Sequence, residues 1–178
     1  SLHDTMKMME GYVDVVVLRH PCDGAAQWAA DSVGIPVINA GDGVNQHPTQ
    51  TLLDLYTIKE TQGTLENLSL AMVGDLKFGR TCHSLVRALA HVDVRLYFVS
   101  SSALEMPKEI CNRRRENVIK FSFHKTIEEV LPKVDILYMT RIQEERFADR
   151  TEYEHVKNLY SLQMSHLVGL KENFKVLH

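Results

Sequence analysis

The chain alternates short β-branched runs with segments of helical spacing along most of its length. Strand-like runs such as VDVVVLR (13–19) and LSLAMVGD (68–75) are each followed by a helical pattern. Parallel strands need long crossover connections, and helical crossovers cover both faces of the sheet. The alternation therefore predicts an α/β fold in which right-handed βαβ units build open parallel sheets.

The expected elements follow one another in a strand–helix order. Strands are expected at 13–19, 35–40, 68–75, 94–100, 118–123 and 135–140, with a strand-like run at 174–178. Helices are expected at 24–33, 48–62, 81–92, 107–117, 126–134 and 153–160. Pro48 suits the first turn of its helix and Gly63 suits the exit. Within this helix, Leu52, Leu55 and Tyr56 are expected to anchor it in the core.

The most polar connection is KETQGTLENLS (59–69), which places a domain boundary near Gly63. Residues 1–62 and 63–178 are then expected to form two α/β sub-domains, the first of them incomplete. The chain opens at Ser1 without an initiator Met and closes on the strand-like run FKVLH. We therefore expect a chain that is cut at both ends.

The composition of the chain argues against several classes of protein. Hydrophobic residues make up 44% of the 178 residues and charged residues 24%, as in soluble globular proteins. The net charge of −3, with lysine and arginine dispersed along the chain, argues against nucleic acid as a partner. The longest apolar runs have the length of strands, which argues against a membrane span. Three cysteines without a CxxC spacing favour a reduced, cytoplasmic compartment.

A cation or a strong hydrogen-bond donor follows four of the expected strands. Ligands of open α/β sheets bind outside the carboxyl ends of the strands. Guanidinium groups suit carboxylates and phosphates, because they donate two parallel hydrogen bonds. We therefore expect a ligand with several negative charges at this edge. The candidate residues are Arg19 after 13–19, Arg80 after 68–75, Arg141 and Gln143 after 135–140, and His47 and Gln50 after 35–40.

Cofactor and metal motifs are weak in this sequence. Gly74 and Gly79 flank DLKF but do not make a GxGxxG fingerprint, so a dinucleotide site has little support. Cys82 and His83 are adjacent, a spacing that suits no ordinary zinc site. We therefore expect neither a cofactor nor a metal. The arginines at 113–115 and 146 are interpreted as solvated charges.

Four long motifs resemble the catalytic chain of the aspartate carbamoyltransferases. They are VVLRHP (16–21), GDGVNQHPTQTLLDLYTI (41–58), MVGDLKFGRTCHSLVRAL (72–89) and DILYMTRIQEERF (135–147). The HPTQ element also occurs in ornithine carbamoyltransferases, whereas TRIQxER and GDLKxGRT point to aspartate. The resemblance runs along essentially the whole chain.

The resemblance implies a reaction and a set of ligands. The family transfers the carbamoyl group of carbamoyl phosphate to the amino group of L-aspartate, a step of pyrimidine synthesis that needs no cofactor or catalytic metal. By matching position, Arg19, His47 and Gln50 bind carbamoyl phosphate, with Arg19 and His47 as the catalytic residues. Arg80, Arg141 and Gln143 bind aspartate. The family is trimeric with sites shared between subunits, and some members pair with a regulatory chain.

The sequence also departs from the family pattern. The family's S-T-R-T phosphate loop and a lysine-bearing loop would precede Ser1, and an H-P-L-P-R motif would begin at His178. Phe78 stands where many members carry Tyr. Two alternatives therefore stay open. One is a carbamoyltransferase for another amino acid, and the other is a non-catalytic or incomplete module that keeps the fold.

His47 stands where a helix is expected to begin. The positive end of a helix disfavours an imidazolium, so the neutral ring is the expected resting form. A neutral ring can donate a hydrogen bond to a carbonyl oxygen as negative charge develops there. The alternative is a histidine that only caps or packs. For Gln50, in the first helical turn, the alternative is an ordinary surface residue.

Overall fold

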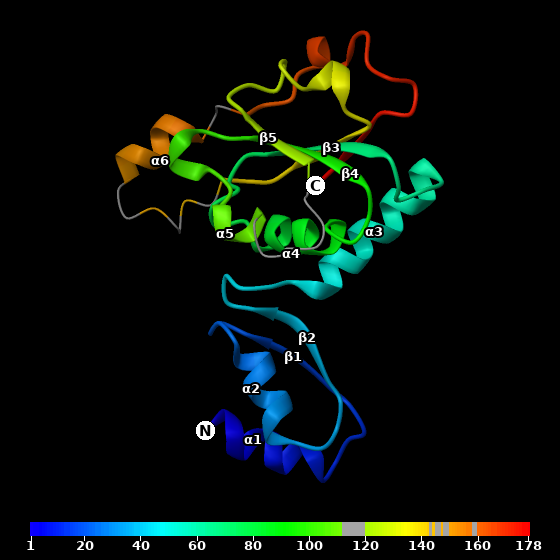
Figure 1. Ribbon diagram of the computed structural model, residues 1–178. Coiled ribbons are helices and arrows are strands. Elements are labelled where there is room, and N and C mark those ends of the chain that lie inside the picture. The colour runs from blue at the N-terminus through cyan, green and yellow to red at the C-terminus, as the bar shows by residue number, and fades with distance from the viewer. Residues whose placement is uncertain (112–119, 143, 145–146, 148–149, 158–159) are drawn as a thin grey trace.

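The computed structural model describes the chain except for residues 112–119, 143, 145–146, 148–149 and 158–159 (Figure 1). The described residues form two sheets. A two-stranded sheet pairs β1 (Val16–His20) with β2 (Val37–Asp42), and a five-stranded sheet has the order β5-β4-β3-β6-β7. Every neighbouring pair in these sheets is parallel, so the predicted fold class of open parallel α/β sheets is confirmed.

The remaining elements have the following bounds. The strands of the larger sheet are β3 (Leu68–Val73), β4 (Val94–Val99), β5 (Lys120–His124), β6 (Ile136–Met139) and β7 (Lys175–Leu177). The α-helices are α1 (Leu2–Glu10), α2 (Ala25–Ser32), α3 (Pro48–Gln62), α4 (Arg80–Leu89), α5 (Lys108–Cys111) and α6 (Arg150–Val156). Short 3-10 helices cover Ser102–Leu104, Leu131–Lys133 and Met164–Leu167. The prediction for α3 matches residue for residue.

The predicted helix over 126–134 is wrong. This segment makes turns and a single 3-10 turn at Leu131–Lys133. Pro132 explains the difference, because it has no amide hydrogen to donate to the carbonyl four residues earlier and its ring clashes there. The expected helix over 107–117 and the strand over 118–123 fall partly outside the described residues. Helix α1 was not expected from the sequence.

The core of the five-stranded sheet lies on both of its faces. Successive side chains of a strand point to opposite faces, so Leu70 and Met72 of β3 pack with α3 and α4, whereas Ala71 and Val73 face the other way. On that second face, turns and 3-10 segments take the place of helices. Their buried apolar side chains are Ile127, Val130, Leu131 and Val134.

Helix α3 presents a different face to the core from the one expected. Thr51, Asp54 and Ile58 are its buried residues, and Leu55 is partly buried. Leu52 and Tyr56 are each 66% exposed, so their expected role as core anchors is wrong. The apolar residues of α3 do not all lie on one side of the helix, so they cannot all pack against the core. The side of α3 that carries Asp54 faces the rest of the protein.

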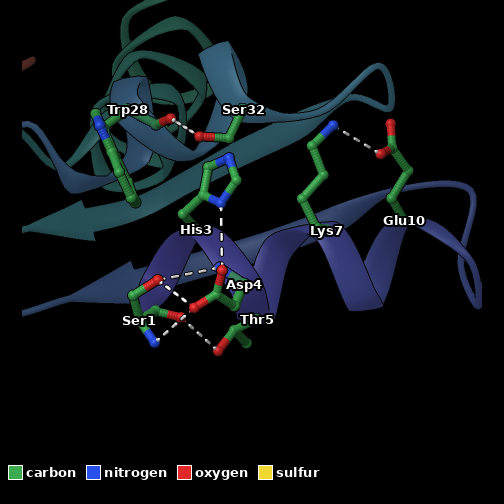
Figure 2. Close-up of polar contacts among 8 residues, drawn as sticks. All are labelled: Ser1, His3, Asp4, Thr5, Lys7, Glu10, Trp28 and Ser32. Atoms are coloured by element: carbon green, nitrogen blue, oxygen red, sulfur yellow. Dashed lines mark hydrogen bonds and ion pairs between the residues drawn. The ribbon is translucent and has the colours of Figure 1, made fainter.

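The smaller sheet is supported by α1 and α2. Ser1 and Asp4 close a capping box at the start of α1, where the Asp4 amide donates to Ser1 Oγ at 3.2 Å (Figure 2). The rings of His3 and of Trp28 on α2 meet in a T-shaped arrangement, with 5.9 Å between the centroids. Met6 is the buried residue of α1. Helix α2 packs against the two-stranded sheet and α1 packs against α2, below α3 and α4 in Figure 1.

Candidate functional site

The sheet order creates a switch point between β3 and β6. From β3 the chain moves outward to β4 and β5, and it then returns to place β6 on the other side of β3. Ligand sites of open α/β folds lie at such a point, outside the carboxyl ends of the strands. Here Gly74 directly follows β3 and Thr140 follows β6. A Cβ on Gly74 would collide with the carbonyl oxygen of Thr140, so only glycine allows this approach.

His47 is the N-cap of α3 and is hydrogen-bonded to α4. Its ring Nδ1 accepts a hydrogen bond from the Gln50 amide at 3.3 Å, and its own amide donates to Ser84 Oγ at 3.0 Å. Because Nδ1 accepts the amide hydrogen, the proton of the neutral ring lies on Nε2. His47 is therefore a cap, and it retains one donor that the cap does not use.

The surroundings of His47 favour the neutral ring. The pKa of His47 is lowered. Burial is the largest cause, the positive charges of Arg80 and Arg19 lower the pKa further, and the negative charge of Asp54 raises it. The direction agrees with the expectation for a neutral ring. The cause differs, because burial and two guanidinium groups act here rather than the helix end alone.

Arg19 and Arg80 line one cavity of about 600 Å³. It lies between the carboxyl end of β1, the loop after β2 and the start of α4, with Asp23 and Gly43 in its wall. Arg80 Nη1 donates to the carbonyl oxygen of Gly43 at 2.5 Å, which aims the guanidinium toward the smaller sheet. The structure thus brings together one residue expected for carbamoyl phosphate and one expected for aspartate.

Gln50 and Arg141 line a neighbouring cavity of about 260 Å³ together with Thr81, Tyr138 and His178. Arg80 and Thr81 are consecutive, so the start of α4 separates the two cavities. Of the two arginines expected for aspartate, Arg80 lines the first cavity and Arg141 lines the second. Gln143 lies outside the described residues.

Asp42 holds the loop that leads to His47, and sequence reasoning missed it. The carboxylate is 1% exposed and accepts hydrogen bonds from the Gly24 amide at 2.8 Å and from the side-chain amides of Asn39 and Asn45, each at 3.0 Å. Burial raises the pKa of Asp42, but these hydrogen bonds outweigh it and the pKa is lowered. Its position in GDG, between a strand and a helix, was the available signal.

Asp54 and Tyr138 were also missed. Tyr138 donates its hydroxyl hydrogen to Asp54 Oδ2 at 3.0 Å, and Gln50 Nε2 donates to Asp54 Oδ1 at 2.9 Å. Asp54 and Tyr138 are each 2% exposed. Burial raises the pKa of Asp54, and its two hydrogen bonds oppose the shift. An acidic residue four positions after Gln50 in a helix was the sequence signal for this pair.

Other groups add little chemistry to this site. Burial raises the pKa of the Cys82 thiol to about 12 and that of Cys111 to about 11, so both stay protonated near neutrality. Among the residues that the structure describes, no three His, Cys, Asp or Glu side chains gather to hold a metal ion. In the same part of the chain, we find no helix with the length and apolar content to cross a membrane.

A further cavity of about 590 Å³ lies at the carboxyl ends of β4 and β5. His124 pairs there with Glu129 at 2.9 Å and His166 pairs with Glu128 at 3.1 Å. None of the expected residues that the structure describes is among its lining residues. The expected guanidinium groups of Arg19, Arg80 and Arg141 line the two cavities beside the start of α4 instead.

The parallel sheets and the guanidinium groups around their strand ends define an α/β protein in which cationic groups gather at the ends of parallel strands. The family described as "Aspartate/ornithine carbamoyltransferase, carbamoyl-P binding domain" matches residues 1–60, and its "Asp/Orn binding domain" matches residues 66–178. The chain belongs to the aspartate/ornithine carbamoyltransferase family.

Curated relatives are named aspartate carbamoyltransferase catalytic subunits. The chain is 55% identical to the subunit of Vibrio campbellii and 54% identical to that of Thermococcus kodakarensis, over 100% of its own length in both cases. It spans 58% and 57% of those two proteins, respectively.

Solved structures of aspartate transcarbamoylases also match this chain. The catalytic subunit of M. jannaschii aspartate transcarbamoylase matches with a TM-score of 0.88 at 47% identity, over 100% of this chain and 58% of that one. Aspartate transcarbamoylase from Trypanosoma cruzi in complex with N-(phosphonacetyl)-L-aspartic acid matches with a TM-score of 0.90 at 33% identity, over 99% of this chain and 57% of that one.

Proposed function

We propose that a protein carrying this chain transfers the carbamoyl group of carbamoyl phosphate to the amino group of L-aspartate, giving N-carbamoyl-L-aspartate and phosphate for pyrimidine synthesis. The observation that carries the proposal is a neutral His47 whose pKa is lowered by burial and by the charges of Arg80 and Arg19, two guanidinium groups that line one cavity. Such a site offers fixed donors to a substrate that is anionic and develops further negative charge during attack.

Arg19 and His47 act on the carbamoyl donor. Arg19 offsets the charge of the phosphate, and the Nε2 hydrogen of His47 donates to the carbonyl oxygen as the tetrahedral intermediate forms. Gln50 adds a polar contact from the first turn of α3. The cap on Nδ1 fixes both the tautomer and the direction of the ring, which is what a preorganised donor requires.

Arg80, Arg141 and Gln143 act on the amino acceptor. Two guanidinium forks can hold the two carboxylates of aspartate and direct its amine at the carbonyl carbon. The two cavities that hold these arginines flank the start of α4. The departing phosphate accepts the proton of the amine, so the reaction needs no dedicated protein base, cofactor or metal.

The organisation of the protein follows the same proposal. Residues 1–62 form the C-terminal half of the carbamoyl-phosphate-binding domain and residues 63–178 most of the aspartate-binding domain; the ranges matched by the two family descriptions support this division. We further propose a cytoplasmic homotrimer, which pairs with a regulatory chain in some family members. Sedimentation equilibrium of the complete protein tests the trimer, and a monomer at micromolar concentration would count against it.

A direct assay tests the reaction. The complete protein is supplied with carbamoyl phosphate and either L-aspartate or L-ornithine, and the carbamoylated product is identified by mass spectrometry. We expect turnover with aspartate alone, because two arginines suit two carboxylates better than a cationic side chain. Turnover with ornithine alone would assign another acceptor. Binding of N-(phosphonacetyl)-L-aspartate without turnover would support the non-catalytic alternative.

Replacement of His47 by Ala tests the catalytic donor. We expect kcat to fall by about 10²–10³, the range seen when an oxyanion donor is removed. His3→Ala, on α1 and away from both cavities, is the control and should leave kcat unchanged. An unchanged kcat in the His47→Ala protein would reduce His47 to a helix cap.

Replacement of Arg141 by Lys tests the carboxylate contact. A lysine keeps the charge but cannot form two parallel hydrogen bonds, so we expect KM for aspartate to rise roughly 10-fold or more together with a lower kcat. Arg95→Lys, an exposed position on β4, is the matched control. Full activity of the Arg141→Lys protein would refute the assigned role.

A further inference from the structure

Asp54 connects the start of α3 with the end of β6. Its carboxylate accepts one hydrogen bond from Gln50 in its own helix and one from Tyr138, which lies 84 residues later in the sequence. Both Asp54 and Tyr138 are 2% exposed, whereas Gln50 reaches the cavity that Arg141 also lines. The three side chains therefore form one chain of contacts from the core to the cavity wall.

The chemistry of this chain decides which end of the Gln50 amide faces the cavity. Both carboxylate oxygens of Asp54 accept hydrogen bonds, one from Tyr138 and one from Gln50 Nε2, so the side-chain NH2 group of Gln50 is turned toward Asp54. The amide oxygen is then the atom left for the cavity. Tyr138 occupies the second carboxylate oxygen, which keeps Asp54 in the rotamer that reaches Gln50.

We propose that Asp54, held by Tyr138, is a positioning residue that presents the Gln50 side-chain oxygen to the substrate as a hydrogen-bond acceptor. The partner is an N–H group of the bound carbamoyl donor, since the arginines nearby serve the oxygens. This role rests on the proposed function, because it assigns a contact within the same site.

The test variant is Asp54→Asn. The substituted side chain would still accept from Tyr138 with its oxygen, but it would offer its own NH2 group to Gln50. The Gln50 amide then has to reverse, and its NH2 group faces the cavity in place of the oxygen. We expect the Kd for N-(phosphonacetyl)-L-aspartate to rise only slightly, because its single N–H belongs to the aspartyl amide and it has no counterpart of the carbamoyl NH2 group. We expect KM for carbamoyl phosphate to rise roughly 10-fold, as for the loss of one good hydrogen bond.

The chain offers a matched control in α2. Gln27 Nε2 donates to Asp31 Oδ1 at 2.9 Å with the same spacing of four residues, but this pair is exposed and lines neither of the two cavities. Asp31→Asn changes the same chemical group in the same local geometry. We expect it to leave Kd, KM and kcat unchanged.

Two further measurements separate positioning from folding. Tyr138→Phe removes only the hydroxyl group that holds Asp54, and it should raise KM for carbamoyl phosphate in the same direction with a smaller factor. The side-chain amide signals of Gln50 in ¹⁵N–¹H spectra of the free protein should shift in Asp54→Asn and stay in place in Asp31→Asn. Circular dichroism verifies that each variant is folded.

The outcomes are distinct. A shifted Gln50 signal with a raised KM for carbamoyl phosphate supports the positioning role. An unchanged KM in a folded Asp54→Asn protein overturns it, while turnover by the unmodified protein keeps the proposed function. If the unmodified protein neither binds the analogue nor turns over, the proposed function fails and the positioning role fails with it.

Discussion

The two sheets of this molecule are built from similar sequence runs and differ in how far they are buried. In the five-stranded sheet, Leu96 and Phe98 of β4 are 0% exposed. In the two-stranded sheet, Val17 of β1 is 63% exposed and Ile38 of β2 is 45% exposed. The larger sheet has buried apolar clusters on both faces, whereas the smaller sheet packs against α2, which α1 contacts in turn.

The difference shows that a β-branched run predicts a strand but not its burial. Burial depends on how many layers pack against the sheet, and two strands alone are marginally stable in water. The smaller sheet nevertheless supplies Arg19 at the end of β1 and the loop that Asp42 holds before His47. The positions of Arg19 and of the loop before His47 thus depend on the less buried, two-stranded sheet.

The largest expected effect comes from Phe98→Ala. Removal of a fully buried phenyl ring should lower the free energy of unfolding by about 3–5 kcal/mol. The matched change in the other sheet, Ile38→Ala, should cost no more than about 1 kcal/mol because Ile38 is half-exposed. Urea denaturation followed by circular dichroism measures both variants, and similar losses would contradict the comparison.

Two glycines with positive φ test the packing around each sheet. Gly74 has a φ of +115° and a Cβ there would meet the Thr140 carbonyl oxygen, so Gly74→Ala should cost about 3 kcal/mol through strain and displacement of β6. Gly24, before α2, has a φ of +76° and open space around it, so Gly24→Ala should cost about 1 kcal/mol. Thermal unfolding measures the difference, and equal shifts in Tm would show that the close approach at the switch point is unimportant.

The smallest expected effect is a pH dependence of the larger region. Burial raises the pKa of Asp135, but hydrogen bonds from Lys171, the Ser69 amide and Asn173 outweigh it and lower the pKa below the ordinary 3.8. A lowered pKa stabilises the folded protein above about pH 4, and this stability is lost as the pH falls through the folded-state pKa. Asp135→Asn should therefore flatten the acid limb of the stability curve.

Fluorescence and circular dichroism can separate the regions in this experiment. Trp28 is the single tryptophan and lies on α2 beside the smaller sheet, so its fluorescence reports that region. We expect Asp135→Asn to change the acid transition seen by circular dichroism more than the one seen by Trp28. Identical changes would mean that the two regions unfold as one unit.

Much of the fold was predictable from local patterns. The order of strands and helices, the parallel sheets and the bounds of α3 follow from periodicity, Pro48 and Gly63. The helix predicted at 126–134 failed at Pro132, a signal that was visible in the sequence. The sequence also predicted that Arg19, His47 and Gln50 lie at one edge of the fold. Each of them follows an expected strand, and the carboxyl ends of parallel strands meet at the same edge of a sheet.

The sequence by itself determined the local conformation of most segments, the family and the residue types offered at the strand ends. Only the tertiary structure decided that Leu52 and Tyr56 face outward, that Arg80 and Arg141 line separate cavities, and that Tyr138 reaches Asp54. The physical reason is the separation along the sequence of the residues that interact. Periodicity reflects contacts between residues a few positions apart, whereas these outcomes depend on which surfaces meet after the chain has folded.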